Sequence, residues 1–106
     1  MQSFDIQKVS QVDDEIGGFV EEGQTFKEVQ GYLDMLSGTD LTAMQNAFVE
    51  ESTHVLVVPK FADGITDNMR IVDKDGRYYS ISYVDNPVGI DHHNEIYCKY
   101  GGVVGG

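Results

Sequence analysis

The densest group of side chains able to bind a metal or move a proton lies near the C-terminus, where Asp91, His92 and His93 precede Glu95 and Cys98. Carboxylate, imidazole and thiolate groups all bind transition metals. In an extended strand His93 and Glu95 share a face, whereas Cys98 points to the other. The sequence has no second cysteine, so the pattern of a structural zinc site is missing. We predict no metal, and interpret the group as a polar loop followed by a strand with a buried, inert thiol.

The other residues with catalytic potential lack the partners that catalysis needs. His54 lies within an apolar strand, where an imidazole with satisfied nitrogens is the usual outcome. Ser80 and Ser82 have no general base at a recognisable spacing, and no carboxylate stands in an apolar, pocket-forming context. The Gly-Gly pairs at 101–102 and 105–106 are not followed by the helix of a phosphate site. We therefore predict a protein that is not an enzyme and uses no cofactor.

The size and charge of the chain further limit the classes of protein to which it could belong. The 106 residues suffice for one domain with a modest core. The net charge is −11, of which −9 falls in residues 1–51 and −2 in the rest. A conventional nucleic-acid binder needs a basic footprint, so this class is excluded, and the simplest interpretation is a surface that resists self-association. No apolar run is long enough for a membrane span. No basic-then-apolar stretch opens the chain, so secretion is not expected, and the single cysteine fits a reducing compartment.

The N-terminal third is typical of strands. Residues 4–9 alternate weakly between apolar and polar side chains. Residues 13–18 are expected to form a loop, because two adjacent glycines give it conformational freedom, and residues 19–21 resume a strand. Residues 26–36 form another predicted strand. Its core face is expected to consist of Val29, Leu33 and Met35.

A short helix is predicted next. Ser37 and Thr39 are both plausible N-caps. Leu41, Met44 and Phe48 follow at helical spacing. Their apolar face either packs on the protein's own sheet or faces a neighbouring subunit.

The second half begins with a strand at 52–58 that is apolar on both faces, which indicates a central position. In the hairpin that follows, a two-residue turn would place Lys74 opposite Arg77, and like charges across a ladder repel. We therefore predict a three-residue loop at 74–76, with Asp73 opposite Arg77 and Gly76 in the left-handed conformation. The inward residues would be Tyr79, Ile81 and Tyr83. A long loop at 85–93 precedes a last strand in which Ile96, Cys98 and Tyr100 share a face.

Many short strands and one short helix predict a mostly β protein, a small antiparallel β-barrel or sandwich with one short inserted α-helix. We expect one barrel-like domain over residues 1–100. Residues 101–106 are expected to be a flexible Gly-rich tail, or a strand that becomes ordered on assembly.

Four short motifs carry a resemblance to a known family. They are Arg-Ile at 70–71, Asp-Gly-Arg-Tyr-Tyr-Ser-Ile at 75–81, Val-Asp-Asn-Pro at 84–87 and Glu-Ile-Tyr-Cys at 95–98. In this order they resemble the head–tail joining (head-closure, or stopper) proteins of long-tailed bacteriophages. The similarity covers about residues 20–100, by the order of the elements. The C-terminal tail with its two Gly-Gly pairs has no counterpart.

The resemblance implies a β-barrel carrying a helix and long loops, and a structural virion protein that closes the portal channel and joins the DNA-filled head to the tail. The implied partners are a portal or adaptor ring, a tail or tail-terminator protein, and further copies of the chain in a ring, although the free protein could be a monomer. Encapsidated DNA would lie nearby without sequence-specific binding. The implied location is the neck of the virion, and the host cytoplasm before assembly.

Two loops and the helix are the candidate interfaces. One loop carries Asp13, Asp14 and Glu15. The other carries Asp85, Asn86, Asp91, His92 and His93. Long loops are often functional, and the resemblance implies that a loop in the lumen of a ring can plug DNA, while acidic residues there would repel phosphates. The helix offers Leu41, Met44 and Phe48. Each loop could equally be an ordinary solvated connection.

Three alternatives remain open at this point. A tail-terminator or neck protein of the same virion also forms rings from small β-rich subunits. A free barrel that binds a ligand, as oligonucleotide-binding barrels do, is disfavoured by the acidic excess and the lack of a basic, aromatic groove. A small hydrolase using His92 or His93 has no supporting constellation. Neighbouring portal, scaffold and capsid genes would favour the virion proteins.

Overall fold

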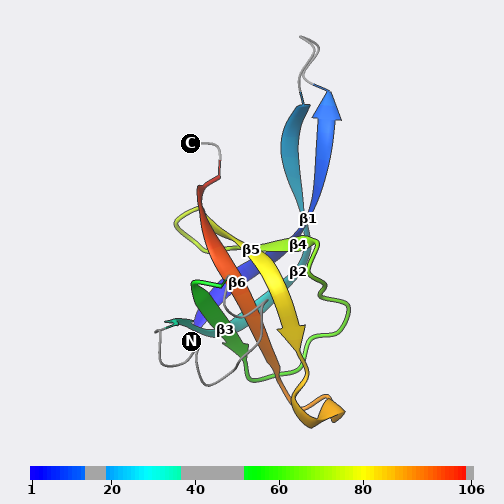
Figure 1. The fold of residues 1–106 in the computed structure, drawn as a ribbon, viewed down its shortest axis with the longest axis vertical. Coiled ribbons are helices and arrows are strands. Elements are labelled where there is room, and N and C mark those ends of the chain that lie inside the picture. The colour runs from blue at the N-terminus through cyan, green and yellow to red at the C-terminus, as the bar shows by residue number, and fades with distance from the viewer. Residues whose placement is uncertain (14–18, 37–51, 105–106) are drawn as a thin grey trace.

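The computed structural model describes residues 1–13, 19–36 and 52–104, which form a closed antiparallel barrel (Figure 1). Its strands are β1 (Gln2–Asp13), β2 (Phe19–Met35), β3 (His54–Val58), β4 (Met69–Val72), β5 (Arg77–Asp85) and β6 (Asn94–Val103). A 3-10 helix, η1 (Pro87–Gly89), lies between β5 and β6. Around the barrel the strands follow the order β1-β2-β3-β6-β5-β4. Of the two predicted architectures, barrel and sandwich, the barrel is therefore correct.

The barrel interior is filled by aliphatic and aromatic side chains from alternate positions of its strands. The most deeply buried of them are Phe4, Ile6, Leu56, Ile71 and Ile96, each with at most 1% of its surface exposed. Strand β3 pairs with β2 on one side and with β6 on the other. The predicted central position of this strand is confirmed, and it explains why polar alternation is absent from its sequence.

The three-residue loop between β4 and β5 is confirmed. Gly76 has a φ of +82°, and the Asp73 amide donates a hydrogen bond to the Arg77 carbonyl at 2.9 Å. The Asp73 carboxylate accepts hydrogen bonds from the amides of Asp75 and Arg77, both at 2.9 Å. It also pairs with the Arg77 guanidinium at 2.8 Å, and this contact raises the Arg77 pKa. Opposite charges, rather than two like charges, thus face each other across the turn.

Bulges change which side chains face the core. In β5, Ile81 pairs with Cys98 and Tyr83 with Tyr97, so Ser82 is an extra residue. An extra residue reverses the alternation of faces. Tyr79 and Ile81 are buried as predicted, but the prediction for Tyr83 is wrong, because its side chain is 37% exposed. Val84 packs against the core after the bulge.

The N-terminal strands also differ from the prediction. Residues 19–35 form one continuous strand rather than two, and Phe26 is an extra residue opposite the step from Ile6 to Gln7 in β1. Val29 is buried and Leu33 packs against the core, as predicted. The assignment of Met35 to the core face is wrong, since it is 77% exposed at the end of the strand.

The predicted boundary at residue 100 needs correction. Gly101, Gly102 and Val103 belong to β6. Gly102 and Val103 extend its ladder with β5, and Gly101 is an extra residue at the register shift. The Val104 amide then donates to the Gly76 carbonyl at 2.7 Å. A flexible tail starting at residue 101 is therefore wrong for 101–103, because these residues make the backbone hydrogen bonds of a strand.

Some predictions fall on residues that the structure does not describe. The inserted helix with Leu41, Met44 and Phe48 lies within 37–51, and Asp14 and Glu15 lie within 14–18, so both are outside the described ranges. Among the residues that are described, no helix is long and apolar enough to cross a membrane.

His54, at the start of β3, is expected to make stability depend on pH. Its Nδ1 lies 2.8 Å from the Thr53 hydroxyl, its ring packs edge-on against Tyr79, and burial lowers its pKa below the ordinary 6.5. The unfolded chain then takes up this proton more readily than the folded one. The free energy of unfolding should fall as the pH drops from above 6.5 through the lowered pKa.

Urea denaturation at pH 7.5, 6.5 and 5.5 measures this slope. The His54→Gln variant should lose part of it, while His92→Gln, an exposed substitution, serves as the matched control. An identical slope in the His54 variant and the unaltered protein would contradict the assignment.

Candidate functional site

The first candidate surface is the outer half of the β1–β2 hairpin, which we call the arm (residues 9–13 and 19–23). Strand β4 pairs with β1 only at Asp5–Lys8, and β3 pairs with β2 only at Tyr32–Met35. Within the described chain, the residues of the arm therefore pair only with each other. Figure 1 shows this two-stranded ribbon projecting beyond the barrel along the 46 Å axis of the molecule. Both outer edges of such a ribbon offer unpaired backbone groups.

The base of the arm is held by a buried arginine. Arg70, on β4, is only 7% exposed. Its Nε donates to the Gln7 side-chain oxygen at 2.9 Å, and its guanidinium lies over the Tyr78 ring at 5.4 Å from the centroid. Gly23, where a side chain would collide with both Gln7 and Arg70, lets these groups approach the strand. These contacts tie β1, β4 and β5 together where the arm leaves the barrel.

The second candidate surface is the connection between β5 and β6. The Asn86 side chain donates to the Asp91 carboxylate at 2.7 Å and accepts from the Asp91 amide at 3.1 Å. Asp91 has a φ of +55°, a conformation that aspartate tolerates better than most residues. This loop, predicted as long and polar, is thus built around its own hydrogen bonds. In Figure 1 it lies at the end of the molecule opposite the arm.

The two histidines of this loop lie beside the start of β6. Their Nδ1 atoms are 3.2 Å apart, and His93 Nε2 lies 3.1 Å from the Glu95 carboxylate. Glu95 in turn pairs across the ladder with Asp85. The structure thus brings His92, His93 and Asp85 together near Glu95, and leaves Asp13 at the end of β1 in the arm. Burial, followed by the charge of Glu95, raises the pKa of Tyr97 to about 12.

Cys98 is separate from this group. It lies in the core, with its thiol 3.6 Å from the His54 carbonyl. Across the described residues, no group of three or more His, Cys, Asp or Glu side chains could hold a metal ion. The loop histidines and the thiol consequently do not converge on one site.

The Cys98 thiol is expected to be unreactive in the folded protein. Burial raises its pKa to about 12, and only the thiolate is nucleophilic. Ellman's reagent at pH 8 should label less than about a tenth of the protein within an hour, and one thiol per chain in denaturant. Stoichiometric labelling of the folded protein within minutes would contradict this burial.

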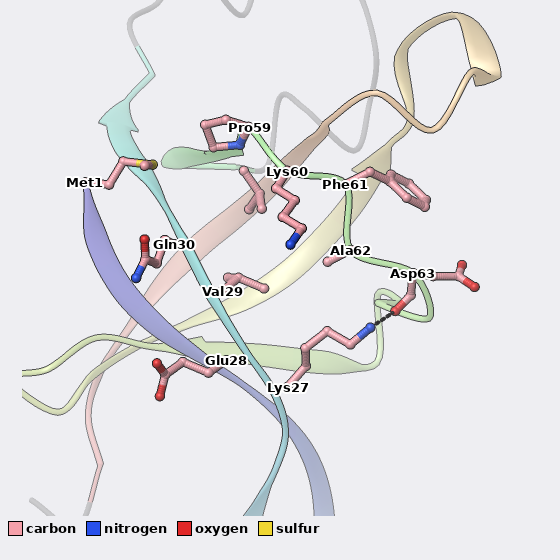
Figure 2. Close-up of a pocket in the computed structure, with 11 residues that line it drawn as sticks. Met1, Lys27, Glu28, Val29, Gln30, Pro59, Lys60, Phe61, Ala62 and Asp63 are labelled. Atoms are coloured by element: carbon pink, nitrogen blue, oxygen red, sulfur yellow. Dashed lines mark hydrogen bonds between the residues drawn. The ribbon is translucent and has the colours of Figure 1, made fainter.

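The third candidate surface is a pocket of about 520 Å³ between β2 and the segment that follows β3 (Figure 2). Its lining residues are Met1, Lys27, Glu28, Val29, Gln30, Val58, Pro59, Lys60, Phe61, Ala62 and Asp63. The pocket exists because β3 leaves β2 after the pair of Val57 with Tyr32. Beyond this pair the edge of β2 faces the pocket instead of a strand.

Polar contacts hold the outer wall of the pocket. Lys27 Nζ donates to the Asp63 carbonyl at 2.8 Å. Asn94, only 2% exposed, accepts from the Ala62 amide at 2.7 Å and donates to the Ala62 carbonyl at 3.2 Å. Sequence reasoning missed both the pocket and the role of Asn94. The available signal was an amide at the start of the last strand, on the same face as the apolar Ile96 and Cys98.

Comparison with known proteins identifies the family. The family model described as phage head completion protein matches residues 2–101. The chain belongs to this family. The resemblance inferred from the four motifs is thereby confirmed, and the match reaches further toward the N-terminus than the predicted start near residue 20. Membership in the phage head completion family implies a structural role in joining head and tail, and a location in the virion.

The fold is also found among solved structures. The solution structure of protein SF1141 from Shigella flexneri 2a is similar with a TM-score of 0.69 and 19% sequence identity. The similarity covers 95% of this chain and 92% of that chain. At this identity the likeness shows the barrel fold alone. No curated protein matches the sequence.

Proposed function

We propose that this head completion protein docks on the portal or adaptor ring of a long-tailed phage, closes the channel that holds the packaged DNA, and presents a surface to the tail. The match of the family model over residues 2–101 carries this proposal. It covers the barrel, the arm and the β5–β6 loop, which are all the elements the role would use.

The geometry supports a connector that contacts partners at both ends. The arm and the β5–β6 loop lie at opposite ends of the molecule (Figure 1). A subunit in a neck must contact one component above and another below. In this role the free chain is a monomer, and copies assemble into a ring on the portal. The excess of acidic residues keeps the phosphates of the passing DNA from adhering.

Binding to the portal ring tests the proposal. The purified protein is mixed with the portal ring from the same genome, and the complex is weighed by native mass spectrometry. We expect a monomeric free chain and a stoichiometric number of copies on the portal. Stable rings that form without the portal and do not bind it would instead favour a tail-terminator. If the protein neither binds the portal nor forms rings, the proposal is overturned.

A further inference from the structure

The pocket beside β2 combines positive charge with an apolar floor and an open strand edge. Figure 2 shows the Lys60 amine pointing into the space between β2 and residues 59–63, and the Lys27 amine on its wall at the Asp63 carbonyl. The carboxylates of Glu28 and Asp63, which also line the pocket, point away from this space. Val29 and Val58 form the floor. The lining holds two lysines and two acids, but the amines rather than the carboxylates lie toward the space. The pocket is therefore a local positive site on a molecule with seven lysines and arginines against eighteen acids.

The surroundings of the pocket extend this positive site. Lys8 lies over the ring of Phe26 at 4.8 Å from its centroid, and Lys27 lies over the same ring at 5.4 Å. Phe26 is the extra residue of the β2 bulge and is 37% exposed. Lys27 and Lys60 line the open edge of β2, and the exposed Phe26 ring with Lys8 lies beside Lys27. This arrangement suits an extended, acidic segment.

The arm has the matching properties. Its two strands end in unpaired outer edges, because in the described chain no third strand flanks them. Its sequence carries the acids Asp13, Glu21 and Glu22 and no basic residue. An unpaired strand edge is a template for pairing with another chain.

The arm cannot reach the pocket of its own molecule. Glu22 and Lys27 lie on the same extended strand, β2, five positions apart, which corresponds to about 17 Å at 3.3–3.4 Å per residue. The arm also points away from the barrel along the long axis (Figure 1). An arm that occupies the pocket therefore belongs to another copy.

We propose that the arm of one copy docks into the lysine pocket of the next copy. The contact joins two different surfaces of the chain, and a repeated head-to-tail contact of this kind closes into a ring if the rotation between copies permits. The inference deepens the proposed function, since it names the contact that would build the ring.

Cross-linking in the free protein tests this contact without a portal. The Glu22→Cys variant is mixed with the Lys60→Cys variant at high concentration and treated with a short bismaleimide. The control mixture pairs Glu22→Cys with Lys74→Cys, which replaces an exposed lysine in the β4–β5 loop. We expect a cross-linked dimer at least about fivefold more abundant in the first mixture, since unguided encounters sample both lysines alike. Equal yields in the two mixtures would overturn the proposal.

A charge swap separates docking from misfolding. At the high protein concentration used for cross-linking, a weak contact is populated even though the chain is monomeric in dilute solution. Under these conditions Glu22→Lys and Lys60→Glu should each weaken self-association in sedimentation velocity, and a mixture of the two variants should associate better than either alone. A mixture no better than its components would contradict the charge pairing. These measurements use only the free chain, so they test the contact even if the protein does not bind the portal. If the protein binds the portal but the two cross-linking mixtures give equal yields, only this contact between copies is rejected.

Discussion

Replacing Leu56 by alanine is expected to lower the free energy of unfolding by about 3–4 kcal/mol, within the range of about 2–5 kcal/mol for a leucine truncated in a packed core. Leu56 has no exposed surface and lies in the central strand β3, between β2 and β6. Neighbouring strands on both sides limit how far the barrel can collapse into the cavity. A domain of this size is stable by only about 5–15 kcal/mol, so the loss is a large fraction of the total.

Urea denaturation followed by circular dichroism measures this effect. Met35→Ala is the matched control, because Met35 is an apolar side chain of similar size that is 77% exposed on the neighbouring strand. Its effect should stay within about 0.5 kcal/mol. Similar losses in the two variants would contradict the burial that defines the core.

Replacing Asn94 by alanine is expected to cost about 2–3 kcal/mol. The substitution removes the reciprocal hydrogen bonds to the amide and carbonyl of Ala62, and a buried polar group left without a partner costs about 1–3 kcal/mol. Asn94 is buried where β6 begins. Its loss should therefore release the segment at 59–63 that forms the outer wall of the lysine pocket.

Two measurements check this role. The free energy of unfolding should fall for Asn94→Ala and stay within about 0.5 kcal/mol for Gln30→Ala, an exposed residue of the same pocket. Hydrogen exchange of the Ala62 amide should be faster only in the Asn94 variant. Unchanged exchange at Ala62 would show that the amide side chain does not hold the loop.

Much of the barrel was predictable from local chemistry. The charges of Asp73, Lys74 and Arg77 distinguished a three-residue turn from a two-residue turn, because the shorter turn sets two cations opposite each other. The polar connection at 85–93 and the central strand were equally visible, since the first has turn residues and the second lacks polar alternation. These features depend on residues close together in sequence.

The errors arise where structure depends on distant residues. A bulge adds one residue to a strand and reverses the faces beyond it, and the sequence around Phe26 and Ser82 carries no local mark of this change. Tyr83 was therefore assigned to the wrong face. The arm was missed because its length depends on where β3 and β4 stop pairing, and the Asn94 contact joins segments about thirty residues apart.

The candidate surfaces also differ in whether the sequence could predict them. Asn86, Asp91, His92 and His93 were expected in one loop, and their mutual hydrogen bonds show it folded on itself. The lysine pocket was not predictable, because Lys27 and Lys60 meet only where β3 separates from β2.

The most direct test of the head completion role is to assemble phage particles without this protein. We expect such heads to lack tails and to lose their packaged DNA. Freshly filled heads should become infectious when purified protein and then tails are added. Infectious, tailed particles assembled in the complete absence of the protein would contradict this role.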